Sequence, residues 1–109
     1  MIYFLLARLS GQGQQAMRDN PEILNDVCRE VSVPGTQLLA RYAVLGQYDF
    51  VLMAEAKDPL SVARLSVELG ARARIHIETL PAISIGLLAE PSEEGLLPMV
   101  NVIEDPTGE

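Results

Sequence analysis

The chain has 109 residues, enough for one hydrophobic core but not for two. Its composition, 49% hydrophobic and 21% charged residues, excludes a disordered protein, and the few aromatic residues predict an aliphatic core. The net charge of −7 repels nucleic-acid backbones and anionic membranes, so neither is an expected partner.

Cysteine and histidine each occur once, as Cys28 and His76. One cysteine cannot form an intramolecular disulfide, and one histidine cannot supply a multi-histidine metal site within a single chain. We therefore expect no metal and no cofactor. The apolar segment 2–9 lacks the basic flank of a signal peptide. No apolar run reaches the roughly 18 residues of a membrane span, so the sequence predicts a cytoplasmic protein.

The first part of the chain predicts a strand followed by a helix. The short apolar segment Ile2–Leu9 is typical of a buried strand. After a Gln-rich stretch, Asn20-Pro21-Glu22 supplies the N-cap, proline and acidic residue of a helix start. The helix ends in a turn at Val33-Pro34-Gly35. One apolar stripe at helical spacing supports this helix: Ile23, Leu24, Val27, Cys28 and Val31.

Two strand-like segments, residues 36–45 and 48–56, form a predicted β-hairpin. Gly46-Gln47 between them fits a two-residue type II′ turn, because glycine adopts the positive φ that this turn requires. Asp49 is expected to accept backbone hydrogen bonds at the turn. We therefore interpret Gly46 and Asp49 as structural residues of the turn.

A second helix and a last strand complete the pattern. Asp58-Pro59 repeats the helix-start signature, Gly70 is the expected C-terminal cap, and residues 73–80 form the strand. The order β-α-β-β-α-β predicts an α+β, ferredoxin-like fold over residues 1–85, with two helices on one face of a four-stranded antiparallel sheet. Residues 86–109 are then a C-terminal tail, whose apolar segment is expected to add a strand or to pack against another subunit.

Two helices cover one face of such a sheet and leave the other uncovered. The predicted hairpin pairing places Tyr48, Phe50 and Leu52 on the uncovered face, and alternation in the last strand adds His76 and Glu78. Because both faces of the hairpin are apolar, the sheet needs a second covering layer, which a monomer of this length cannot supply. The pattern predicts a homodimer or a higher oligomer formed sheet to sheet.

Residues 41–51 resemble the Leu-Gly-x-Tyr-Asp signature of the GYD domain family, and the likeness extends over roughly residues 2–85. A looser similarity joins residues 46–84 to the ligand-sensing domain of Lrp/AsnC-type regulators. Both families resemble the dimeric α/β-barrel group, in which two ferredoxin-like sheets pack face to face. The resemblance therefore implies the same dimer, and it implies no particular activity.

Four polar side chains are candidates for a ligand site at the seam between the two sheets, since strand alternation places them nearest to it: Arg41, Tyr48, His76 and Glu78. Histidine is a common acid–base group near neutral pH, but a solvated histidine is the simpler interpretation here. None of the four forms a recognised catalytic spacing, so we predict no catalytic residue.

The sequence favours a non-enzymatic homo-oligomeric module that holds a small molecule at the seam. One alternative is a cofactor-free enzyme of the dimeric α/β-barrel kind, similar to a monooxygenase or an isomerase, with His76, Arg41 and Glu78 in its cleft. Such an enzyme needs a histidine or a carboxylate that faces an apolar chamber. The other alternative is a purely structural assembly subunit without a ligand.

Overall fold

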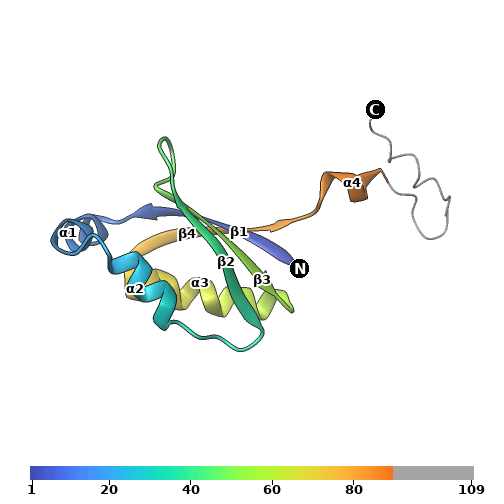
Figure 1. Cartoon of the computed structure of the whole chain (residues 1–109), viewed down its shortest axis with the longest axis horizontal. Coiled ribbons are helices and arrows are strands. Elements are labelled where there is room, and N and C mark those ends of the chain that lie inside the picture. The colour runs from blue at the N-terminus through green and yellow to red at the C-terminus, as the bar shows by residue number, and fades with distance from the viewer. Residues whose placement is uncertain (90–109) are drawn as a thin grey trace.

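The computed structural model describes residues 1–89 as a four-stranded sheet with two helices packed on one face (Figure 1). The strands are β1 (Ile2–Leu9), β2 (Thr36–Ala43), β3 (Phe50–Ala56) and β4 (Ile75–Ala82), all antiparallel and in the spatial order β2-β3-β1-β4. The helices are α1 (Gly11–Asp19), α2 (Ile23–Glu30), α3 (Pro59–Ala73) and the short α4 (Ile85–Leu88). The predicted ferredoxin-like α+β fold is confirmed.

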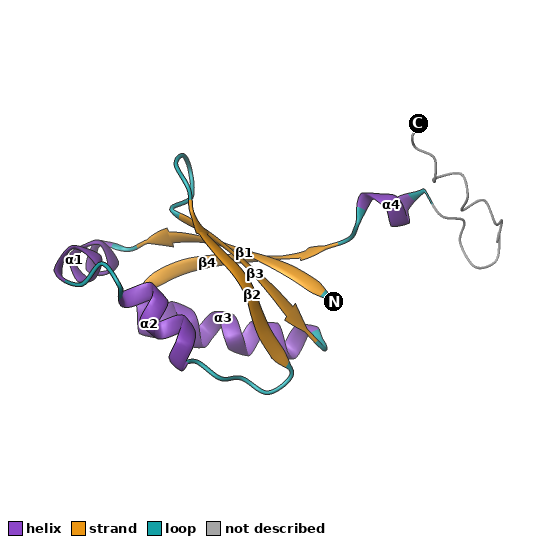
Figure 2. Ribbon diagram, in the orientation of Figure 1, coloured by secondary structure: helices purple, strands orange, loops and turns teal. Residues whose placement is uncertain are grey.

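The hydrophobic core lies between the sheet and the helices α2 and α3, which share one side of the sheet (Figure 2). Successive side chains of a strand face opposite sides, so alternate residues of β1 and β3 enter the core. Leu5 of β1 lies opposite Leu52 of β3, and both are fully buried together with Leu69 of α3. The central strands are therefore fixed by contacts between residues far apart in the sequence.

The sequence pattern predicted neither the short α4 nor α1, which forms in the Gln-rich stretch. The Gln-rich stretch has glycines in what becomes its first turn, which lowers its helix propensity. Ser10 compensates as the N-cap: its hydroxyl accepts the Gly13 N–H at 2.9 Å and donates to the Arg74 carbonyl oxygen at 2.7 Å. A tertiary contact at the helix start thus overrides the local preference.

Two helix boundaries differ from those predicted. α2 starts at Ile23, because Asn20 ends α1 instead of capping α2. α3 starts as predicted, but Gly70 does not end it, and the helix continues to Arg74, a C-cap with a left-handed φ of 58°. A Cβ at Gly70 would lie 3.1 Å from the carbonyl oxygen of Ile75. Glycine at this position therefore admits the backbone that leads into β4.

The hairpin loop is longer than two residues, so the prediction of a two-residue turn is wrong. β2 ends at Ala43 and β3 starts at Phe50. Between them, the Val44 N–H donates to the Asp49 carbonyl oxygen at 2.9 Å. Gly46 has a φ of 127°, a conformation that glycine adopts without a steric penalty. Tyr48 consequently lies in the loop and not in the strand.

The hairpin faces are the reverse of those predicted. Leu52 is buried against Leu5, and Phe50 packs on the core, so both side chains face the helices. Strand alternation alone could not choose between two apolar faces, and the pairing of β3 with β1 makes the choice. The opposite side of the sheet, which no other element within residues 1–89 covers, is here called the outer face, and its apolar residues are Ile2, Phe4, Leu6, Ala40, Tyr42, Val51, Met53 and Leu80.

Both edge strands of the described sheet are irregular. The register of β2 against β3 shifts between Leu38 and Ala40, which marks a bulge. β4 extends to Ala82, beyond the predicted end at residue 80, and so includes Pro81. Proline lacks an N–H, so it is tolerated at a sheet edge and not in a central strand.

The tail is described only as far as residue 89. Ile85, Leu87 and Leu88 of α4 are exposed there. The apolar segment 99–103, expected to add a strand or to pack on another subunit, lies outside the described residues. No helix within residues 1–89 is long and apolar enough to cross a membrane.

Candidate functional site

The outer face is a continuous apolar surface on the central strands. Phe4 of β1 lies between Met53 of β3 and Leu80 of β4, and Leu6 lies opposite Val51. The helices α2 and α3 pack on the other side of the sheet (Figure 1). An apolar sheet face without a covering layer is a typical interaction surface.

A cluster of polar side chains lies at one end of the outer face. The Tyr48 hydroxyl donates to Glu78 Oε1 at 2.6 Å. The Arg8 guanidinium lies 5.1 Å from the centre of the Tyr48 ring, and its Nε donates to the Gln47 carbonyl oxygen at 3.1 Å. His76 lies opposite Arg8 in the β1–β4 ladder. Arg8, Tyr48, His76 and Glu78, here called the rim cluster, line a shallow cavity of about 190 Å³.

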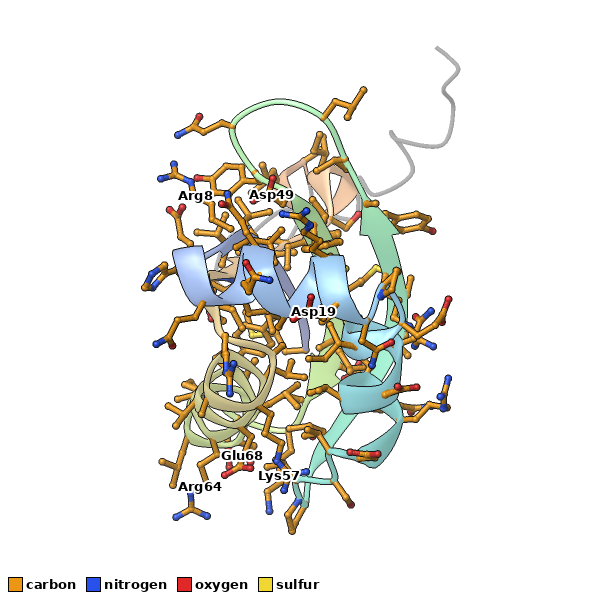
Figure 3. All side chains as sticks on the ribbon, turned by 90° about the vertical axis from the view of Figure 1, so that its left-hand side faces the viewer. Arg8, Asp19, Asp49, Lys57, Arg64 and Glu68 are labelled. Carbon is orange, nitrogen blue, oxygen red and sulfur yellow. The ribbon has the colours of Figure 1, made fainter. Side chains whose placement is uncertain are left out.

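Asp49 attaches the hairpin loop to β1 and so positions Tyr48. Its carboxylate accepts the Leu9 N–H at 2.9 Å, and its own N–H donates to the Ala7 carbonyl oxygen at 2.8 Å. Arg8 and Asp49 accordingly lie at the same end of the molecule in Figure 3. The acceptor role expected of Asp49 is therefore with β1 and not within the turn.

Arg41 does not join the rim cluster. It lies opposite Leu52 in the β2–β3 ladder, which places it on the helix side of the sheet. Its Nε donates to Asn25 Oδ1 of α2 at 2.9 Å. Of the four predicted ligand residues, the structure brings together Tyr48, His76 and Glu78 and separates Arg41 from them. The cleft shared by His76, Arg41 and Glu78 that an enzyme would need is absent from the described part of the chain.

Arg8 is a site residue that the sequence interpretation missed. Alternation in the first strand carries a signal for it, since Phe4, Leu6 and Arg8 share one face of β1. The contact of Arg8 with the hairpin loop depends on how Asp49 attaches that loop to β1. No local sequence pattern indicates this attachment. Among the described residues, no group of three or more His, Cys, Asp or Glu side chains could hold a metal ion.

The hydrogen bond to Glu78 raises the pKa of Tyr48, because it stabilises the protonated phenol. Partial desolvation and the negative charge of Glu78 act in the same direction, and Arg8 opposes them. We expect Glu78→Gln to lower the pKa of Tyr48 and Arg8→Gln to raise it further. NMR titration of a ¹³C-labelled tyrosine ring measures both shifts. Shifts of the same sign in the two variants would contradict the geometry of the rim cluster.

Comparison with known proteins places these elements in one family. The model of the GYD domain matches residues 3–90, which include all of the sheet except Ile2, the first residue of β1. A protein of Thermus thermophilus, named glutamine synthetase and cystathionine beta-lyase binding protein, is 37% identical over 84 residues. The aligned part covers 76% of this chain and 88% of that relative. The chain therefore belongs to the GYD domain family, as the resemblance of residues 41–51 predicted.

Proposed function

We propose that this chain is a non-enzymatic, homo-oligomeric protein-binding module that acts in the cytoplasm. The apolar outer face on the two central strands, which no element within residues 1–89 covers, is the observation that carries the homo-oligomeric part of the proposal. The Thermus relative is named for binding two enzymes, glutamine synthetase and cystathionine beta-lyase. We extend that kind of partner to this chain, with an enzyme of one of these two types as the bound protein.

In this proposal, the outer face pairs two copies of the chain. Phe4, Leu6 and Met53 leave water when two such faces meet, and fully burying one large apolar side chain is worth about 1.5–3 kcal/mol. The rim cluster then lies at the border of the contact, which matches the polar rim around an apolar centre found in protein interfaces. Face-to-face pairing leaves the helices and loops free for the enzyme partner.

A small molecule at the seam stays part of the proposal. The cavity at the rim cluster, about 190 Å³, is smaller than the roughly 300–1,000 Å³ of ordinary ligand pockets. A second copy has to supply further walls before the cavity can enclose a ligand. The cofactor-free enzyme has less support, because Arg41 lies on the other side of the sheet from His76 and Glu78.

Binding is tested by mixing the full chain with glutamine synthetase or with cystathionine beta-lyase from the same organism. We expect the chain to co-elute with one of the two enzymes in size-exclusion chromatography at micromolar concentration. An unrelated acidic enzyme of similar size serves as the control for non-specific association. Separate elution from both enzymes, with the chain correctly folded, would rule out this partner class.

A further inference from the structure

A second cavity lies on the helix side of the sheet, between α1, α2 and the end of β2. Its volume is about 370 Å³, within the roughly 300–1,000 Å³ of small-molecule sites. Met17 of α1, Leu24 of α2 and Phe50 of β3 form an apolar lining, and Arg41 and Asn25 lie at the same cavity. It shares no lining residue with the cavity at the rim cluster.

The side chain of Arg41 is held in place by two successive hydrogen bonds. Arg41 Nε donates to Asn25 Oδ1 at 2.9 Å, and Asn25 Nδ2 donates to Glu22 Oε1 at 3.1 Å. Burial raises the pKa of the Cys28 thiol, and the positive charge of Arg41 acts against that rise. The guanidinium therefore lies close to α2, and its orientation is set by Asn25.

The terminal nitrogens of Arg41 are left free by this arrangement. Neither donates to a partner among residues 1–89, and Arg41 forms no ion pair there. Arg41 is also the only charged residue among those that line the cavity. A guanidinium whose Nε is already bonded presents its two terminal NH₂ groups in one plane, which fits the two oxygens of a carboxylate.

We propose that this cavity binds a small monocarboxylate, with the carboxylate on the terminal nitrogens of Arg41 and an apolar body against Met17, Leu24 and Phe50. Asn25 is a positioning residue, since it orients Arg41 without touching the ligand. The site goes beyond the proposed protein-binding role and does not depend on it. Most of its lining lies on the helix side, and Tyr42 at the edge strand is the one lining residue that it shares with the outer face.

The test is an NMR titration of the ¹⁵N-labelled full chain with hexanoate, and with hexanamide as the neutral isostere. We expect saturable shifts in α2 and at the end of β2 with hexanoate, and binding of hexanamide weaker by about tenfold or more. Arg41→Gln should weaken hexanoate binding by a similar factor. The side chain of Arg41 is exposed, so the spectrum of the free variant should show an intact fold.

Arg64→Gln is the matched control, because it removes the same charge from α3 at a position outside the cavity lining. Figure 3 shows Arg64 at the opposite end of the molecule from Arg8. Hexanoate affinity should be unchanged in this variant. Equal binding of hexanoate and hexanamide, equal losses in both variants, shifts confined to the rim cluster, or no saturable shift at millimolar hexanoate would each overturn the proposal.

Discussion

Replacing Met53 by aspartate is expected to leave a monomer of 11.9 kDa, whereas the unaltered protein is expected to form a particle of at least twice that mass. Met53 lies on the outer face between Phe4 of β1 and Ala40 of β2, with apolar neighbours on both sides. A carboxylate at this position would lose its hydration in the seam, which costs on the order of several kcal/mol of association free energy. Light scattering at micromolar concentration measures the mass directly.

Two further variants separate assembly from folding. Val67→Asp makes a comparable change on α3, where the side chain is 68% exposed, and should alter neither mass nor melting temperature. Phe50→Asp places a charge against the core and should lower the melting temperature. If Met53→Asp keeps the mass of the unaltered chain, or if that chain is itself a monomer, the outer face is not the seam.

Gly13→Ala is expected to destabilise the fold by about 3 kcal/mol. Gly13 is buried in the first turn of α1, and a Cβ there would collide with the backbone carbonyl oxygen of Arg74. A backbone atom cannot move aside as the end of a flexible side chain can. The same carbonyl accepts the Ser10 hydroxyl, so the collision also disturbs the helix cap. Urea unfolding followed by circular dichroism measures the loss.

Gly11→Ala supplies the control within the same helix. No atom lies within 4 Å of a Cβ built at Gly11. Alanine is a better helix former than glycine, so this variant should be more stable by about 0.5 kcal/mol. Opposite signs for the two substitutions are the expected signature of a close approach at Gly13. Similar effects at both glycines would show that α1 does not pack on Arg74.

The elements that the sequence predicted well are those whose signals are local. Asp58 accepts the Ser61 N–H at 2.8 Å and Pro59 follows it, as the helix-start pattern requires. Ser10 gives α1 a similar local cap at Gly13, but the glycines of the first turn lower the helix propensity, and the second contact of the cap, with Arg74, lies far along the chain. The side of the sheet that Leu52 faces is likewise decided by Leu5 and not by its own neighbours.

The candidate site was predictable to the extent that its residues keep strand alternation. His76 and Glu78 do so, and both line the rim cavity. Arg41 also follows the alternation of its strand, but the two hairpin faces are the reverse of those predicted, so Arg41 lies on the helix side. Tyr48 reaches Glu78 because the loop takes it out of β3, so it no longer shares a face with Phe50. Strand alternation cannot predict the position of a side chain in a loop, and here the hydrogen bonds of Asp49 to β1 set that position.

The bulge in β2 and Pro81 in β4 also bear on how large an assembly can grow. A free strand edge is a template on which further chains can add their own strands, and repeated addition gives an open fibre. The register shift between Leu38 and Ala40 interrupts the repeat of hydrogen-bonding groups on one edge, and Pro81 removes a donor from the other. Sideways growth is therefore disfavoured at both edges of the described sheet. When two copies pair through their outer faces, each copy has no second outer face for a further copy. An assembly formed in this way therefore has a fixed size.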